Sequence, residues 1–207
     1  MKPLFILLLA SLTLLSNAQN RCGTEAHTLE LIEKYPEYVI AKAKVNYQTE
    51  KWIQNHPNNS QKTIITIPVV VHVVWNTNSE NISDAQIFSQ IEVLNNDFRR
   101  TNVDVINTPS VWQGIAADSE IEFCLANTDP NGNPTSGIVR VRSELTVATV
   151  PRDRAKALSY WNSFQYLNIW VVQSMPAGPD PQTNPALNGY AQFPWSGRMS
   201  TDGVMIR

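Results

Sequence analysis

The sequence predicts an α+β protein built on a twisted mixed sheet of about five strands with one backing helix. The apolar run at 63–75, TIITIPVVVHVVW, is too short to cross a bilayer, which needs about 20 residues, and is typical of a strand buried on both faces. A strongly periodic helix pattern follows at 83–98. Shorter strand patterns recur to the end of the chain, so the strand at 63–75 and the helix after it form the centre of the predicted fold.

The composition fits one globular domain with appendages. The chain has 207 residues, of which 43% are hydrophobic and 16% charged, and its net charge is −2. Lys and Arg form no cluster, which argues against nucleic acid as a partner.

The first 18 residues have the pattern of a secretory signal peptide. Lys2 precedes an apolar stretch at 4–15, and small residues follow at 16–18. The apolar stretch is short for a membrane anchor. We therefore expect cleavage near Ala18, a secreted protein, and no membrane association after cleavage. Lipidation of Cys22 is not expected, because Arg21 precedes it instead of a small residue.

Residues 19–62 form a polar leader with a helical pattern over 24–53. The leader ends in NHPNNSQK at 55–62, which is typical of a linker. A removable propeptide and a helical decoration of the domain both fit this composition.

In the remaining segment, 63–207, two local signals define the first strand and helix. Pro68 cannot donate a ladder hydrogen bond, so it should lie at a bulge, at the strand start, or on a side without a partner. Ser83 and Gln86 have the spacing of a capping box in front of the helix at 83–98. The apolar face of this helix is formed by Ile87, Ile91, Leu94 and Phe98.

The rest of the sheet is predicted from shorter segments. Alternation at 119–126 and 138–142, on either side of the turn-rich DPNGNPTSG at 129–137, predicts a hairpin-like pair over 119–143. A short amphipathic helix is expected at 151–163, opening with Pro151, and strands at 167–172 and 188–193. The segment 202–207 resembles the start of a further strand.

The cysteines and histidines do not form an obvious site. Cys22 and Cys124 could form a disulfide, but Cys124 lies in an apolar strand pattern that favours a buried free thiol. His27 and His56 lie in the leader and His72 lies in the strand at 63–75, so no two share a helix face or a short loop. We expect His72 to be a hydrogen-bonded core residue, and we assign no metal ligand in this chain.

Several short motifs occur in a fixed order along the chain. They are CGT at 22–24, IPVVVHVV at 67–74, ISDAQI at 82–87, LNNDFR at 94–99, IEFCLA at 121–126, DPNG and TSGIVR within 129–140, LNIWV at 167–171, GYAQFP at 189–194 and DGV at 202–204. Through them the chain resembles the pappalysin and cytophagalysin family of secreted, metzincin-like zinc metallopeptidases. The resemblance implies a propeptide at 19–62 and, at 63–207, the upper subdomain of a catalytic domain.

The same resemblance implies that the full-length parent hydrolyses peptide bonds with a Glu-activated, zinc-bound water. The zinc motif of the family, HExxHxxGxxH, is not present in the sequence and would follow shortly after 202–206. We therefore expect the chain alone to bind no zinc, to be inactive, and to expose an apolar sheet face that the zinc helix would cover, with poor solubility as the result. The sequence does not decide whether the parent needs calcium.

Two elements receive functional roles from the resemblance. Cys22 would be the cysteine switch of the propeptide, with a disulfide to Cys124 or an unpaired thiol as the alternative. The strand at 188–193 would bind a protein or peptide substrate in extended, antiparallel form, with Gly189, Tyr190 and Ala191 on the upper rim. A plain edge strand is the alternative for this segment. The rival function is a non-catalytic secreted protein that holds extended peptides on this edge.

Overall fold

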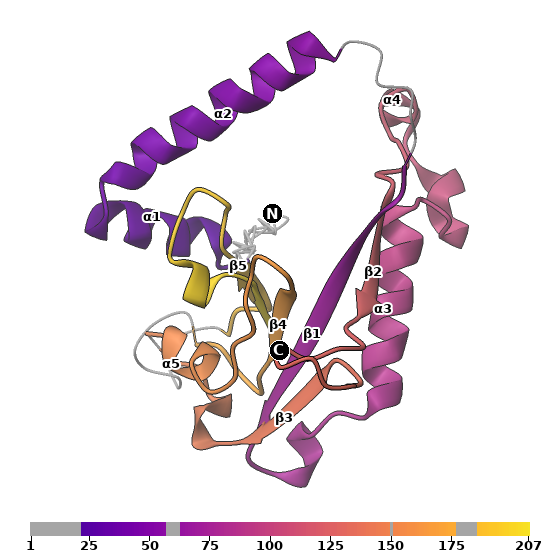
Figure 1. Cartoon of the computed structure of the whole chain (residues 1–207). Coiled ribbons are helices and arrows are strands. Elements are labelled where there is room, and N and C mark those ends of the chain that lie inside the picture. Colours follow the sequence, from indigo (N-terminus) through magenta and orange to yellow (C-terminus); the bar gives the residue numbers. More distant parts are fainter. Residues whose placement is uncertain (1–21, 57–62, 150, 177–185) are drawn as a thin grey trace, which may run out of the picture.

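The computed structural model describes residues 22–56, 63–149, 151–176 and 186–207. The predicted signal peptide and most of the predicted linker lie outside the described residues. Two leader helices, α1 (Thr24–Lys34) and α2 (Glu37–Asn55), precede a mixed sheet that carries α3 (Asp84–Phe98) on one face (Figure 1). Two single-turn helices, α4 (Ser110–Gln113) and α5 (Asp153–Lys156), lie between strands. None of the described helices has the length and apolarity that a membrane crossing requires.

The sheet has six strands in the described residues, and its long strand β1 (Ile65–Trp75) pairs along both edges. On one edge β2 (Ile121–Leu125) and β3 (Ile138–Arg142) follow each other, both parallel to β1. On the other edge β4 (Leu167–Val171) is parallel to β1, and β6 (Val204–Ile206) is parallel to β4. The outermost strand, β5 (Gly189–Ala191), is antiparallel to β6. The predicted mixed α/β class with a backing helix is confirmed, with six strands instead of about five.

The predicted hairpin-like pair over 119–143 is wrong. Ile65 pairs with Ile121 and Val71 pairs with Ile138, so β2 and β3 both bind β1 and not each other. The turn signal between them is real, because the Asp129 carboxylate accepts hydrogen bonds from two backbone N–H groups within 129–133. After this turn the chain returns to the same edge of β1, where β3 pairs with the second half of β1 instead of pairing with β2.

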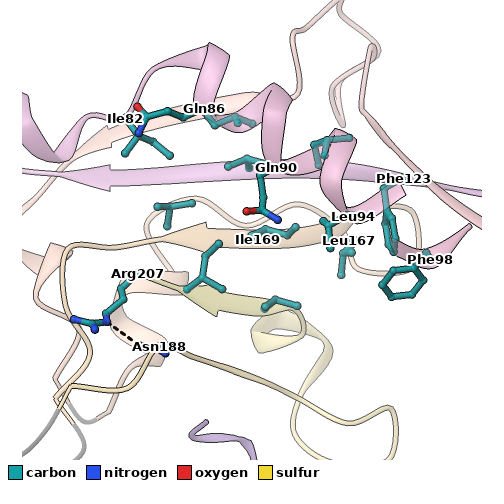
Figure 2. Close-up of a pocket in the computed structure, with 16 residues that line it drawn as sticks. Ile82, Gln86, Gln90, Leu94, Phe98, Phe123, Leu167, Ile169, Asn188 and Arg207 are labelled. Atoms are coloured by element: carbon teal, nitrogen blue, oxygen red, sulfur yellow. Dashed lines mark hydrogen bonds between the residues drawn. The ribbon is translucent and has the colours of Figure 1, made fainter. Parts of the chain in front are cut away.

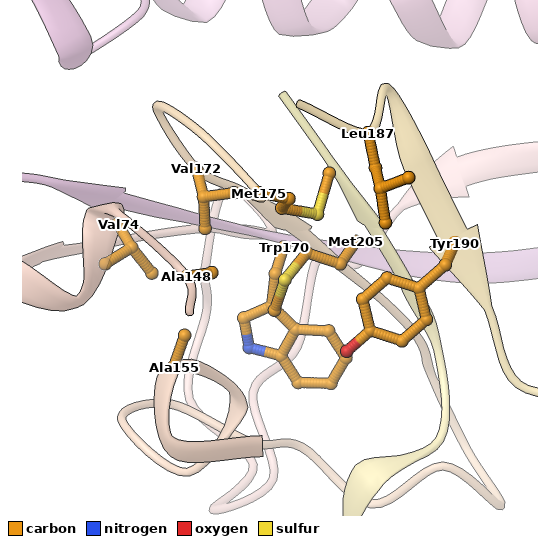
Figure 3. Packing of buried hydrophobic residues seen from close by; sticks show 9 residues of the cluster. All are labelled: Val74, Ala148, Ala155, Trp170, Val172, Met175, Leu187, Tyr190 and Met205. Atoms are coloured by element: carbon orange, nitrogen blue, oxygen red, sulfur yellow. The ribbon is translucent and has the colours of Figure 1, made fainter. Parts of the chain in front are cut away.

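Strand β1 is buried on both faces over 69–74, as predicted, while Ile65 at its start is 61% exposed. Pairing with β4 begins at Val69, one residue after Pro68, so the proline lies where that edge of β1 has no partner strand. Alternate residues of β1 contribute to two cores. One contains Val69, Val71, Val73 and Ile87 of α3. The other, on the opposite face, contains Val74, Trp170, Met205 and Tyr190 (Figure 3).

Helix α3 has the start and end that the sequence predicts. The Ser83 hydroxyl accepts from the Gln86 backbone N–H, and the Gln86 side chain accepts from the Ser83 backbone N–H, which completes the capping box. The Asn95 side chain donates to the Phe123 carbonyl (2.9 Å) and accepts from the Phe123 N–H (2.7 Å). This pair of hydrogen bonds joins α3 to the edge strand β2.

Two helix predictions need correction. The pattern over 24–53 is divided between α1 and α2 at Pro36, because proline disfavours helical geometry in the preceding residue, and Tyr35 has φ −136° and ψ 78°. The helix expected over 151–163 is only the single turn α5. Beyond it, the backbone N–H and C=O of Trp161 bind the buried side chain of Asn168 at 3.0 and 2.8 Å, which replaces helical hydrogen bonds.

Candidate peptide-binding edge

Strand β5 is the edge strand that the sequence singled out. It is three residues long and pairs with β6 in the register Gly189–Ile206, Tyr190–Met205 and Ala191–Val204. The backbone groups of Gly189 and Ala191 point away from β6, because they bind residues of the leader. An edge strand of this kind can add a further extended chain through its outward N–H and C=O groups.

In this structure the start of the leader occupies the outward side of β5. The Gly23 N–H donates to the Gly189 carbonyl at 2.9 Å, and Cys22 forms a parallel bridge with Gly189. The Ala191 N–H donates to the side-chain Oγ1 of Thr24 at 3.0 Å. Helix α1 starts at this point and lies beside β5 (Figure 1). The two outward groups that an extended peptide would use are therefore already bound.

Two glycines allow the close approach of these backbones. A Cβ on Gly23 would lie 2.5 Å from Cδ1 of Leu187 and 3.4 Å from Cβ of Tyr190. A Cβ on Gly189 would lie 2.9 Å from the Met205 carbonyl oxygen on β6. The missing side chain of Gly23 therefore makes room for the leader, whereas that of Gly189 makes room for β6.

Of the three residues predicted on the rim, Tyr190 has its side chain directed inward. It is 2% exposed and packs in the core with Trp170 and Met205 (Figure 3). Burial raises the pKa of its phenol above the usual value. The Lys156 ammonium lies 4.8 Å from the ring centroid, and burial lowers the pKa of Lys156 to about 8. Gly189 and Ala191 therefore present the outward backbone groups, while Tyr190 anchors the strand.

Cys22 is exposed and lies next to the occupied edge, where it forms a bridge with Gly189. Its Sγ is 3.5 Å from Oγ1 of Thr24, and this hydrogen bond lowers the pKa of the thiol. Thr24 therefore touches both Cys22 and the edge strand. No disulfide joins Cys22 to Cys124. The prediction that Cys124 is buried is wrong, since Cys124 is exposed on β2 and its neighbour Phe123 takes the position that α3 covers.

The three histidines lie in separate environments. His72 is fully buried, its Nε2 lies 3.0 Å from Oδ1 of Asn168, and burial lowers its pKa to about 4, so it is a hydrogen-bonded core residue as expected. His56 ends α2 and stacks on Trp52, whereas His27 contacts the ring of Tyr190. Within the described ranges, no group of three or more His, Cys, Asp or Glu side chains could hold a metal ion. These residues do not fit a zinc site, and no reaction step through a metal follows from them.

An apolar groove of about 680 Å³ separates α3 from the face of β4 and β6 (Figure 2). Its walls include Ile91 and Leu94 of α3 and Ile169 of β4, and Arg207 closes one end through a 3.2 Å hydrogen bond to Asn188. The apolar side chains of β4 and β6 beside the groove are buried or half-buried, so the expected exposed sheet face stays a prediction.

Sequence reasoning missed the roles of Gly23 and Thr24. Both belong to the CGT motif at 22–24, but nothing local indicates that they bind a strand more than 160 residues away.

Comparison with known proteins identifies a similar curated sequence and several similar solved structures. No family model matches the chain. An extracellular metalloprotease of Pyricularia oryzae is 27% identical over 210 residues, covering 98% of this chain and 59% of that protein. The structure of a point mutant of Tannerella forsythia promirolysin is 41% identical to this chain, with a TM-score of 0.63. That match covers 89% of this chain and 58% of the promirolysin chain.

Mature mirolysin from the same organism, in complex with a cleaved peptide, is 48% identical with a TM-score of 0.60. That match covers 70% of this chain and 53% of the mirolysin chain. The chain is thus similar to metallopeptidases over almost its whole length, and it spans less than two thirds of the relatives that it matches.

Proposed function

We propose that this chain is the N-terminal part of a secreted zinc metalloendopeptidase precursor of the pappalysin and cytophagalysin type. Residues 19–62 would be its propeptide and residues 63–207 the upper subdomain of its catalytic domain. The observation that carries the proposal is the leader bound across the outward side of β5, through Gly23 and Thr24. A removable segment in this position would keep an extended substrate off the edge strand.

The two structural similarities support this division of the chain. The match to the pro-form covers 89% of the chain and the match to the mature form covers 70%. A difference of this size is close to the length of the proposed propeptide, as expected if the leader corresponds to the part of promirolysin that the mature form lacks. The 27% identity to an extracellular metalloprotease supports secretion together with the signal-peptide pattern at 1–18.

The part of this chain in the reaction would be to hold the substrate. Once the leader has left, the Gly189 carbonyl would accept a hydrogen bond from a peptide N–H, and the Ala191 N–H would donate to a peptide carbonyl. The leader forms a parallel bridge at Gly189, whereas the family resemblance implies an antiparallel substrate, so the two would run in opposite directions on one edge. The complex of mature mirolysin with a cleaved peptide is consistent with a peptide ligand.

Hydrolysis itself would need groups that the described residues do not supply. The zinc of the parent would provide the activated water, but the described side chains do not fit a zinc site. Cys22 is proposed as the latency cysteine of the precursor, because it sits beside the occupied edge with its thiol held by Thr24. This chain alone is proposed to be inactive.

The gene sequence downstream of the codon for Arg207 tests this proposal. An open frame that continues into an HExxH motif would support a peptidase precursor. A stop codon at that point would contradict it and favour the second candidate, a non-catalytic secreted protein that holds extended peptides. That candidate is favoured by one observation, the presence of two outward backbone groups on β5 without a metal site in the described residues.

A peptide-binding measurement on the whole chain tests the edge strand. A fluorescent, strand-forming peptide should bind weakly to the wild-type chain and more tightly to Gly23→Ala, in which the leader is displaced from β5. Gly114→Ala is the matched control, since a Cβ on Gly114 would meet no atom within 4 Å. Equal peptide affinity of all three proteins would refute the role of the edge.

A further inference from the structure

The leader has a second attachment to the body of the protein at His27, one helical turn after Gly23. The imidazole ring contacts the ring of Tyr190 edge to face, with the centroids 4.8 Å apart, and the His27 side chain is 14% exposed. His27 belongs to α1, and Tyr190 belongs to β5. The imidazole therefore lies in the interface that holds the leader on the edge strand.

The body side of this interface carries two cations, Lys156 and Arg152, and one carboxylate, that of Asp153. Lys156 is fully buried, with its ammonium 4.8 Å from the Tyr190 ring centroid, and the Arg152 guanidinium lies 5.6 Å from the same centroid. Two carboxylates act on the imidazole in the opposite sense: Glu30 on the same helix, 4.0 Å from Nδ1, and Asp153 of α5. The cavity that His27 lines, of about 400 Å³, is also bordered by Lys34 of α1 and by Arg198.

We infer that protonation of His27 releases the leader from β5, so that mild acid uncovers the edge strand. A protonated imidazole would place a further positive charge on a side chain that is only 14% exposed and that lies near two cations, Lys156 and Arg152. The bonds from Gly23 to Gly189 and from Ala191 to Thr24 lie within one helical turn of His27, so displacement of α1 at His27 also breaks them.

The sign of the effect follows from the pKa of His27. Burial, followed by Lys156 and Arg152, lowers this pKa below its ordinary value of 6.5, against the opposing effect of Asp153 and Glu30. The docked leader therefore binds a proton less readily than the released leader. Docking is at full strength above pH 6.5 and weakens as the pH falls below that value. The decrease is at most about tenfold in the docking equilibrium for each pH unit.

This inference deepens the proposed function, on which it rests, by naming a trigger for the removal of the same leader. Its test measures docking and not peptidase activity, so it can fail while the downstream reading frame still supports a peptidase. The proposed release of the leader also differs from acid unfolding of the core. Protonation of the buried His72 would destabilise the whole fold, whereas protonation of His27 would weaken only the interface between the leader and β5.

The test is hydrogen exchange of the Ala191 amide in the whole chain, between about pH 7.5 and about pH 5.5, with each rate divided by the intrinsic rate at that pH. Amides of β1 and β4 in the same sample report global unfolding. His27→Gln keeps a neutral side chain of similar size in the interface. His56→Gln is the matched control, because His56 is an exposed leader histidine at the end of α2.

In the wild type and in His56→Gln, protection of Ala191 should fall by up to about tenfold for each pH unit below 6.5 while the β1 and β4 amides remain protected. In His27→Gln the protection should be the same at both pH values. The inference is overturned if His27→Gln responds like the wild type, if wild-type Ala191 does not respond, or if Ala191 loses protection only together with β1 and β4. If the leader of His27→Gln does not dock at either pH, the inference is tested by NMR titration of His27 in the wild type. A titration midpoint below pH 6.5 supports the inference, and a midpoint at or above pH 6.5 refutes it.

Discussion

The contact between the leader and β5 makes a quantitative prediction for Thr24→Val. Valine has nearly the shape of threonine but lacks Oγ1, so the Ala191 N–H loses its acceptor at 3.0 Å. A neutral hydrogen bond contributes about 1 kcal/mol, which corresponds to roughly a fivefold increase in the fraction of molecules with the leader released. The Gly23 amide keeps its acceptor, the Gly189 carbonyl, in this variant, so hydrogen exchange at position 23 measures this fraction. Thr49→Val, on the exposed surface of α2, is the matched control and should have no effect.

Gly23→Ala tests the same interface through sterics. The added Cβ would lie 2.5 Å from Cδ1 of Leu187, a side chain that is 8% exposed and must move. Because the clash is with the terminal methyl of a flexible side chain, the cost should lie at the low end of the range for overpacking, about 1 kcal/mol, or roughly fivefold in leader release. The two substitutions are neighbours, so their effects need not add. If Thr24→Val and Gly23→Ala both leave the exchange of the backbone amide at position 23 unchanged, the leader is not held at β5 and the reasoning fails.

Three further predictions concern the body of the protein. Because burial lowers the pKa of His72 from 6.5 to about 4, its contribution to folding stability is complete above pH 6.5 and declines as the pH falls toward 4. The total loss is about 3 kcal/mol. Chemical denaturation at several pH values should show this decline in the wild type and not in His72→Gln. The purified chain should contain no stoichiometric zinc and should not cleave casein, and stoichiometric zinc by elemental analysis would contradict the assignment of no metal ligands. The apolar groove between α3 and β4 should make the isolated chain self-associate or precipitate, so a compact, cooperative monomer in gel filtration and circular dichroism would count against the view that a further segment covers it.

The parts of the fold that depend on neighbouring residues could be predicted from the sequence. Helix α3 starts and ends as expected because its signals, the capping pair Ser83 and Gln86 and the apolar face, are all contained within the helix itself. The alternation of β2 predicts a strand, but it does not say which strand is its partner, and the hairpin prediction failed for that reason. Alternation also leaves open which face of the strand is covered, and the prediction of a buried Cys124 is wrong for this reason.

The candidate site was predictable only in part, for a related reason. The edge strand at 189–191 could be identified from its motif, but the inward direction of Tyr190 depends on its register with Met205 of β6. The docking of the leader joins Thr24 to Ala191 across 167 positions of sequence, and no local pattern reports such a contact. The shortening of α5 likewise depends on a distant feature, the buried amide of Asn168 that takes the hydrogen bonds of Trp161.

The separation of Thr24 from Ala191 has a consequence for the order of events during synthesis. The leader is among the first segments to leave the ribosome, whereas β5 and its neighbour β6 are the last of the described strands to be made. The leader therefore stays undocked until residue 206 has emerged and β5 has paired with β6. A nascent chain interrupted before that point would contain the leader without the β5 strand to which it binds.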